Sequence, residues 1–232
     1  MIPEINDINP KTWLRPFEKN STFYLLKMAL FYHALSLILM YFGSFLATTA
    51  IPDYEAPQFP VSISLALSAG LLEESIFFGI PYYLTGNPVV LLGTGIVWSI
   101  SHLFSSGTFS VHTLAYGGFL LTIPHIFFSI RTWISGKGWF AILFHSLWNV
   151  TALSTFCAIG LRQCSIFNDV LDILNVIMAS SAGVIVYMAY KNKKNPINRF
   201  LYLVPVAVII IVSVIVFVFV SGGDYYFVFE TS

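Results

Sequence analysis

Two glutamates stand next to each other in the middle of a long apolar run. Glu73 and Glu74 occur in the sequence AGLLEESIFFGIPYYL, with no Lys or Arg within a helical turn. A charged side chain at the centre of a membrane-spanning helix costs about 2.5–3.5 kcal/mol or more, so a carboxylate retained there indicates a function. A lone carboxyl could instead be structural, but two neighbouring carboxyls in a low dielectric resist ionising together. The pair therefore predicts acid–base chemistry.

Three further polar residues interrupt two other apolar runs. His102 ends the run containing VWSISHLF, and His145 and Asn149 occur in AILFHSLWNV. Residues four apart lie one turn from each other on a helix face, so His145 and Asn149 share a face. Histidine is the commonest general base, and an asparagine amide can donate to a developing oxyanion. Each residue alone could simply join two helices by a hydrogen bond, but together with the glutamates they favour hydrolysis by activated water.

We expect these five residues to converge on one cavity in the inner half or the middle of a membrane. Unpaired polar groups at such depths would be too costly. Among the other histidines, His33 is interpreted as structural, whereas His125 could either line the same cavity or be hydrogen-bonded at the Pro124 kink.

The composition indicates a protein embedded in a bilayer. Of 232 residues, 57% are hydrophobic and 9% are charged, whereas soluble domains carry about 25% charged residues. The mean hydropathy is +0.80. Nucleic acid is not expected as a partner, because 11 Lys and Arg balance 11 Asp and Glu and no basic stripe interrupts the apolar runs.

Seven apolar runs approach the roughly 20 residues that a helix needs to cross the hydrocarbon core. They are residues 22–47, 61–84, 88–104, 111–130, 138–160, 168–190 and 200–220. The predicted fold is therefore all-α, a polytopic membrane protein with about seven transmembrane helices. Glu73 and Glu74 fall on the second helix, His102 on the third, and His145 and Asn149 on the fifth.

The Lys and Arg residues predict the orientation of the chain. With the N-terminus inside, ten of the eleven fall in inner positions and only Arg162 lies outside, in keeping with the positive-inside rule. The predicted location is thus the cell membrane, multi-pass, with a cytoplasmic N-terminus. We expect a cytoplasmic juxtamembrane segment at 1–20, a single transmembrane domain at 21–220 with a core at about 66–152, and a short tail at 221–232.

Motifs of other intramembrane hydrolases are missing from the sequence. It contains no HExxH of a zinc protease, no GxSG of a rhomboid serine protease and no intramembrane Asp pair. With only Cys157 and Cys164, no cysteine-based zinc site is expected.

The polar residues resemble the motifs of the CPBP family, the CAAX-processing and bacteriocin-processing (abortive-infection) intramembrane proteases, which includes the type II CAAX prenyl endopeptidases. The family pattern is EExxxR, then FxxxH, then HxxxN, on separate transmembrane helices. Glu73 and Glu74 begin the first motif, WSISH ends the second at His102, and HSLWN supplies His145 and Asn149 for the third. The resemblance covers about residues 66–152.

The resemblance implies an intramembrane peptide hydrolase. Glu73, assisted by His102, would activate water, and His145 and Asn149 would stabilise the oxyanion. The expected partners are a peptide or membrane-protein substrate and the lipid bilayer. No cofactor is expected, although two His and a Glu could hold a zinc ion with one position open.

Two positions depart from the family pattern. Trp98 replaces the Phe of the second motif, and Phe78 replaces the Arg of the first. Because that cation is missing, we expect Glu74 to be protonated and Glu73 to act as the base, unless Arg131 or Lys137 supplies a substitute charge. Two alternatives stay open: a catalytically inactive CPBP-like scaffold or immunity protein that binds a partner, and a small transporter whose glutamates carry protons.

Overall fold

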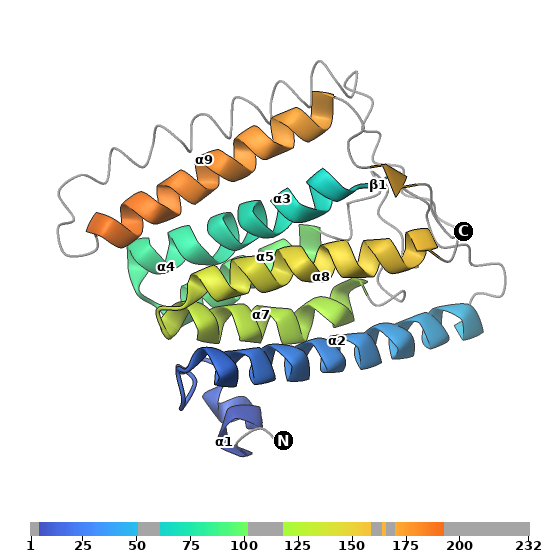
Figure 1. The fold of residues 1–232 in the computed structure, drawn as a ribbon. Helices are drawn as coiled ribbons and strands as arrows, with labels where there is room; N and C mark the ends of the chain where they lie inside the picture. The colour runs from blue at the N-terminus through green and yellow to red at the C-terminus, as the bar shows by residue number, and fades with distance from the viewer. Residues whose placement is uncertain (1–4, 51–60, 102–117, 159–163, 166–169, 193–232) are drawn as a thin grey trace. The chain divides into compact units, whose positions relative to one another are not determined.

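The computed structural model describes residues 5–50, 61–101, 118–158, 164–165 and 170–192. Its elements are α1 (Ile5–Ile8), η1 (Pro10–Thr12), α2 (Thr22–Ala50), β1 (Val61–Ser62), α3 (Ile63–Glu74), η2 (Ser75–Gly79), α4 (Ile80–Thr85), α5 (Pro88–Ser101), α7 (Gly118–Ile134), α8 (Gly138–Ala158), β2 (Cys164–Ser165) and α9 (Val170–Asn192). Figure 1 shows their course along the chain.

The all-α prediction is confirmed for the described residues. Helices occupy the parts of the first six apolar runs that the structure describes, and the seventh run, 200–220, lies outside them. The exception is a two-residue parallel pairing of β1 with β2, with Val61 opposite Cys164. The long apolar runs therefore form helices, as their length and continuous hydrophobicity predict.

Within the described part of the chain, one helix is long and apolar enough to cross a membrane. This is α2, through its segment Thr22–Leu39. Helix α7 has 17 residues and α5 has 14, so both fall short of the roughly 20 residues of a full span. The number of spans predicted from the sequence, about seven, stays a prediction.

The chain divides into two compact units, and the first contains the N-terminal segment, α2, α5 and α7. Helix α7 packs against both α2 and α5, and it runs beside α2 in Figure 1. Phe128 of α7 is fully buried, and its ring lies 6.0 Å from that of Tyr32 on α2. An apolar and aromatic contact between α2 and α7 thus forms the core of this unit.

A buried ion pair ties the N-terminal segment to this core. The side chains of Asp7 and Arg131 are both inaccessible to solvent and form a salt bridge. The guanidinium also donates to the Asp7 carbonyl at 2.5 Å, and it stacks 4.2 Å from the centre of the Phe17 ring. The hydroxyl of Tyr24 donates to the other Asp7 carboxylate oxygen. Asp7 and Phe17 therefore hold the described N-terminal segment on the C-terminal end of α7.

The turn after α7 meets the same N-terminal segment. Gly136 has a φ of 72°, and the Gly136 and Lys137 amides donate to the carbonyls of Trp133 and Thr132, which is a Schellman motif. The Asn20 side-chain amide donates to the Ser135 carbonyl at 2.9 Å. The N-terminal segment and the loop at Lys137 thus lie at one end of this unit, and the predicted membrane topology stays a prediction.

The second unit contains α3, η2, α4, most of α8, and α9. Helix α3 packs along α9. It also contacts α8 very closely, because a Cβ atom on Gly70 would lie 2.5 Å from the Ser146 amide nitrogen and 2.8 Å from its Cα. The Ser146 hydroxyl donates to the Leu67 carbonyl at 2.8 Å. A small residue on α3 therefore lets two helix backbones touch.

Removing Asp7 should destabilise the protein strongly. Asp7→Ala leaves the buried Arg131 guanidinium without its carboxylate, and breaking a buried pair on one side costs about 3–5 kcal/mol. Thermal and denaturant unfolding of the purified chain in detergent would measure the loss. Glu18→Ala, at an exposed position of the same segment, is the matched control. Equal stability of the two variants would contradict the structural role of the pair.

A methyl group at Gly70 should push α3 and α8 apart. Gly70→Ala places a Cβ against the backbone of Ser146, and overpacking of this kind costs about 1–3 kcal/mol. Gly93→Ala is the control, because a Cβ at that helical position meets nothing within 4 Å. We expect Gly93→Ala to be as stable as the unsubstituted chain or slightly more so. If Gly70→Ala unfolds at the same temperature as Gly93→Ala, the close contact is refuted.

Candidate active site

The two glutamates form the C-terminal end of α3, immediately before a change in helix geometry. Residues Ser75–Gly79 form the π-helical turn η2, and the Ile80 amide donates to the Ser75 carbonyl, five residues back. Single π-helical turns inside helices occur frequently at functional sites. Glu74, Ser75 and Phe78 are all buried, so they lie on the inward face of this segment.

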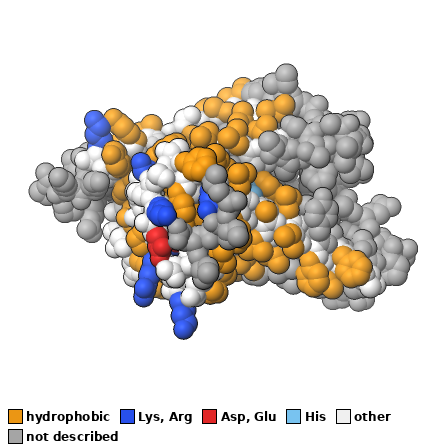
Figure 2. Space-filling view, turned by 60° about the horizontal axis from the view of Figure 1, so that its bottom comes forward, with side chains coloured by type: hydrophobic (Ala, Val, Ile, Leu, Met, Phe, Trp, Pro, Cys, Tyr) orange, Lys and Arg blue, Asp and Glu red, His pale blue; other side chains and the backbone are white. Residues whose placement is uncertain are grey.

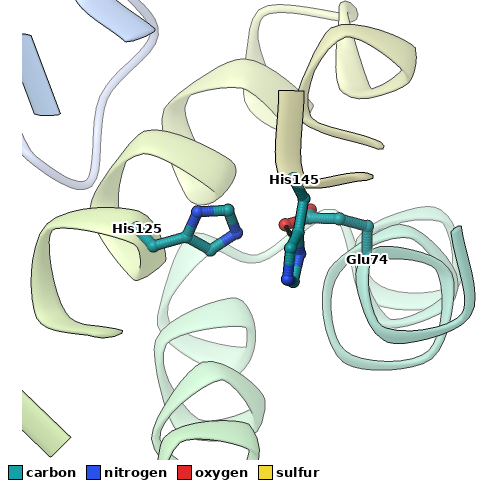
Figure 3. A group of neighbouring side chains, drawn as sticks. All are labelled: Glu74, His125 and His145. Carbon is teal, nitrogen blue, oxygen red and sulfur yellow. Dashed lines mark hydrogen bonds and ion pairs between the residues drawn. The ribbon is translucent and has the colours of Figure 1, made fainter. Parts of the chain in front are cut away.

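One imidazole lies between the two carboxylates. Nδ1 of His145, on α8, is 3.3 Å from Oε1 of Glu74, and its Nε2 is 3.5 Å from Oε2 of Glu73. Figure 3 shows the Glu74 and His145 side chains pointing toward each other from their two helices. The structure therefore brings together three of the five residues predicted from the sequence.

The two contacts limit how many protons Glu73, Glu74 and His145 carry together and where these protons lie. A carboxylate oxygen and a ring nitrogen attract each other only when a proton lies between them. Two contacts therefore need two protons, carried either as an imidazolium between two carboxylates or as a neutral imidazole beside one protonated glutamic acid. Both distributions give the three side chains a net charge of −1, which is easier to bury than the two negative charges of the glutamates alone.

The two carboxylates differ in their access to solvent. The Glu73 side chain is 26% exposed, whereas the Glu74 side chain is fully buried and that of His145 is 5% exposed. Water or a substrate can thus reach Glu73, while Glu74 contacts the inner nitrogen of the imidazole. The geometry separates an outer carboxylate that can react from an inner one that can orient His145.

The contact between Gly70 and Ser146 explains how the two helices position this group. Gly70 lies one turn before Glu73 and Glu74, and Ser146 directly follows His145. Since their backbones touch, short side chains suffice to join the helices at the glutamates. The sequence analysis did not identify either residue, although a small residue one turn before a polar pair in an apolar run is a signal for close helix packing.

Of the two remaining predicted site residues, the structure describes Asn149 but not His102. Asn149 lies one turn after His145 on α8 and is partly exposed, so the predicted helical spacing of the third motif is confirmed. His102 lies outside the described residues, which on this helix end at Ser101 of α5. The convergence of all five residues therefore stays a prediction.

His125 has a packing role within the first unit. A hydrogen bond of 3.2 Å joins its Nε2 to the Ser129 hydroxyl one turn later. Its ring lies 5.9 Å from the ring of His33 and 5.2 Å from that of Trp98. The exchange of Phe for Trp in the second motif thus places an indole against His125. Figure 3 draws the His125 side chain on its helix, without Trp98.

Phe78, at the position of the family Arg, is fully buried in η2. Arg131 and Lys137 were considered as substitutes for the charge of this Arg. Arg131 is bound to Asp7, so it does not supply the substitute charge. Lys137 lies in the Schellman turn after α7. Among the described residues of the second unit, His145 faces both glutamates and can carry a positive charge.

The donor set is chemically suitable for zinc, since imidazole and carboxylate are common zinc ligands. However, both ring nitrogens of His145 face a carboxylate. A metal ion bound between His145 and either carboxylate would replace the proton shared by that pair, because a ring nitrogen must lose its proton to bind a metal. The expectation that the protein needs no metal therefore stays a prediction.

Comparison with known proteins bears on the same region. Residues 55–151 match the family model described as type II CAAX prenyl endopeptidase Rce1-like. No curated protein and no solved structure gave a match to the chain. The matched segment includes Glu73, Glu74, His102, His145 and Asn149, so the similarity covers all three motifs. Residues 55–151 are thus similar to the Rce1-like type II CAAX prenyl endopeptidases, which supports the resemblance to the CPBP family.

Proposed function

We propose that this protein is an intramembrane endopeptidase that hydrolyses a peptide bond of a membrane-associated peptide or protein. The observation that carries the proposal is the shared contact of His145 with a partly exposed Glu73 and a fully buried Glu74. General-base hydrolysis needs a carboxylate that water can reach. It also needs a neighbouring group that stabilises the protonation state of this carboxylate. The Rce1-like match of residues 55–151 supports a protease.

In the proposed mechanism, Glu73 takes a proton from a water molecule as the water oxygen attacks the peptide carbonyl. The carbonyl oxygen becomes an oxyanion, which the Asn149 amide stabilises through a hydrogen bond. Glu73 then returns the proton to the leaving amine as the C–N bond breaks. His102 assists Glu73 with the water, a role that follows from the family resemblance.

Glu74 and His145 act together on Glu73. The buried Glu74 shares a proton with Nδ1 and so fixes the ring with Nε2 directed toward Glu73. While both contacts hold, neither ring nitrogen can donate to an oxyanion, because each faces a carboxylate. His145 therefore contributes to oxyanion stabilisation only when Glu73 swings toward the water, and its resting role is to offset the negative charge of the glutamates.

The proposal includes a multi-pass protein of the cell membrane with a cytoplasmic N-terminus. It is supported by large apolar side chains that are exposed on several helices, a surface that water-soluble proteins rarely present. They include Phe23, Phe42 and Phe45 of α2, Ile96 and Val97 of α5, Leu143 and Leu147 of α8, and Val176 and Val184 of α9. Lipid chains would cover such side chains in a bilayer.

A second candidate is a non-catalytic membrane scaffold that binds a partner, for example an immunity protein. Phe78 favours it, because a buried phenyl ring stands where the family pattern has a cation. The two candidates differ in one requirement. A protease needs an ionised Glu73, whereas a scaffold needs only the shape of the helices.

Replacing the two glutamates should separate these candidates. In a cleavage assay with a library of membrane-associated peptides, read by mass spectrometry, we expect Glu73→Gln to lose activity by about 10²–10⁴-fold, the usual size of a general-base contribution. We expect Glu74→Gln to keep substantial activity, because the amide mimics a protonated Glu74 and can still form the hydrogen bond with Nδ1 of His145.

Glu18→Gln, an exposed carboxylate of the N-terminal segment, serves as the control and should cleave like the unsubstituted chain. Equal activity of Glu73→Gln and the control would refute the assigned base. If the unsubstituted chain yields no products from any peptide, the scaffold is favoured.

A further inference from the structure

Basic side chains gather at the end of the first unit that carries the N-terminal segment. We call this group, Lys11, Arg15, Lys19, Lys27 and Lys137, the basic collar. The first three are exposed and the last two are partly exposed. Figure 2 shows blue side chains on this face, with red ones scarce among them and apolar surface beside them.

Contacts within the unit hold the collar together. The ammonium groups of Lys19 and Lys27 lie 6.0 Å and 5.7 Å from the centre of the same Tyr24 ring. The Arg15 carbonyl accepts from Arg131 at 3.2 Å. Lys137 belongs to the turn that also contains Ser135, whose hydroxyl accepts from the Phe17 amide at 3.2 Å. The positive charges are therefore brought together by the fold.

Burial of Asp7 leaves the collar strongly positive. Its carboxylate is enclosed with Arg131, so this acid contributes no outward charge. The exposed carboxylate among described residues 5–20 is Glu18, which accepts from the Asn6 amide at 2.7 Å. Among the described residues at this end, five basic side chains thus stand against one exposed acidic side chain. Such a surface attracts anions.

Apolar side chains begin where the collar ends. On the first turns of α2, Phe23 is 64% exposed, Leu26 42% and Leu30 60%. A soluble anion would satisfy the lysines but would leave these side chains in water. An anionic phospholipid satisfies both, since its headgroup binds cations while its acyl chains cover the apolar side chains.

We propose that the basic collar binds the phosphate-bearing headgroups of anionic phospholipids on the membrane face that holds the N-terminal segment. The proposal rests on the proposed insertion of the chain in a bilayer and is independent of its hydrolytic activity. The buried Asp7–Arg131 pair keeps the binding segment folded against α7, so the collar is formed before lipid arrives.

The test uses the full-length chain purified in a neutral detergent. Phosphatidylglycerol, phosphatidylcholine with the same acyl chains, and inorganic phosphate are titrated separately, and bound lipid is counted by native mass spectrometry beside the melting temperature. We expect phosphatidylglycerol to bind and to raise the melting temperature, with much weaker effects of the other two. The triple variant Lys11→Gln/Arg15→Gln/Lys19→Gln should bind phosphatidylglycerol about tenfold more weakly or worse.

Lys191→Gln, which removes an exposed lysine at the end of α9, is the matched control and should bind like the unsubstituted chain. The unsubstituted chain gives a second readout, since its preference for phosphatidylglycerol should fall at about 1 M salt, where charges are screened beyond about 3 Å. The proposal would be overturned if both lipids bound equally, or if inorganic phosphate had the same effect as phosphatidylglycerol. It would also be overturned if the triple variant bound phosphatidylglycerol as well as the unsubstituted chain, or if the preference for this lipid did not depend on salt. Recovery of the chain from a membrane fraction tests insertion separately.

Discussion

The shared contact of one imidazole with two consecutive carboxylates is the interaction on which the site depends. Two adjacent glutamates in an apolar unit would repel each other and lose hydration. His145 offsets both costs, because its ring nitrogens face Glu73 and Glu74 at 3.5 Å and 3.3 Å. The distances are possible because Gly70 lets the backbones of α3 and α8 touch. A packing feature of two helices thus determines the electrostatics of the site.

The first unit also contains a buried charge that is offset by a charged partner, but this pair has a structural role. Arg131 is enclosed with Asp7 near Phe17 and Tyr24, and this pair holds the N-terminal segment on the core. In the second unit the matched charges include Glu73, which is partly exposed and can react. In the first unit the matched charges are inaccessible to solvent, so they can only stabilise the fold. Exposure to water, more than residue type, separates the catalytic candidate from the structural pair.

The sequence predicted the helices and the spacing of His145 and Asn149, because continuous hydrophobicity and an i, i+4 pattern are local properties. It also identified Glu73 and Glu74, since carboxylates in an apolar run are costly. It did not predict the partner of Arg131, because Asp7 lies 124 residues away and no local pattern links them. Nor did it predict the π-helical turn η2.

A double-mutant cycle on Glu74 and His145 tests the central contact most directly. The free energies of unfolding of the unsubstituted chain, Glu74→Ala, His145→Ala and the double variant would be measured in one detergent. Because residues in direct contact couple by about 0.5–3 kcal/mol, we predict that the double variant loses less stability than the sum of the single losses by an amount in this range. Losses that add to within about 0.3 kcal/mol would show that the two side chains act independently and would contradict the account.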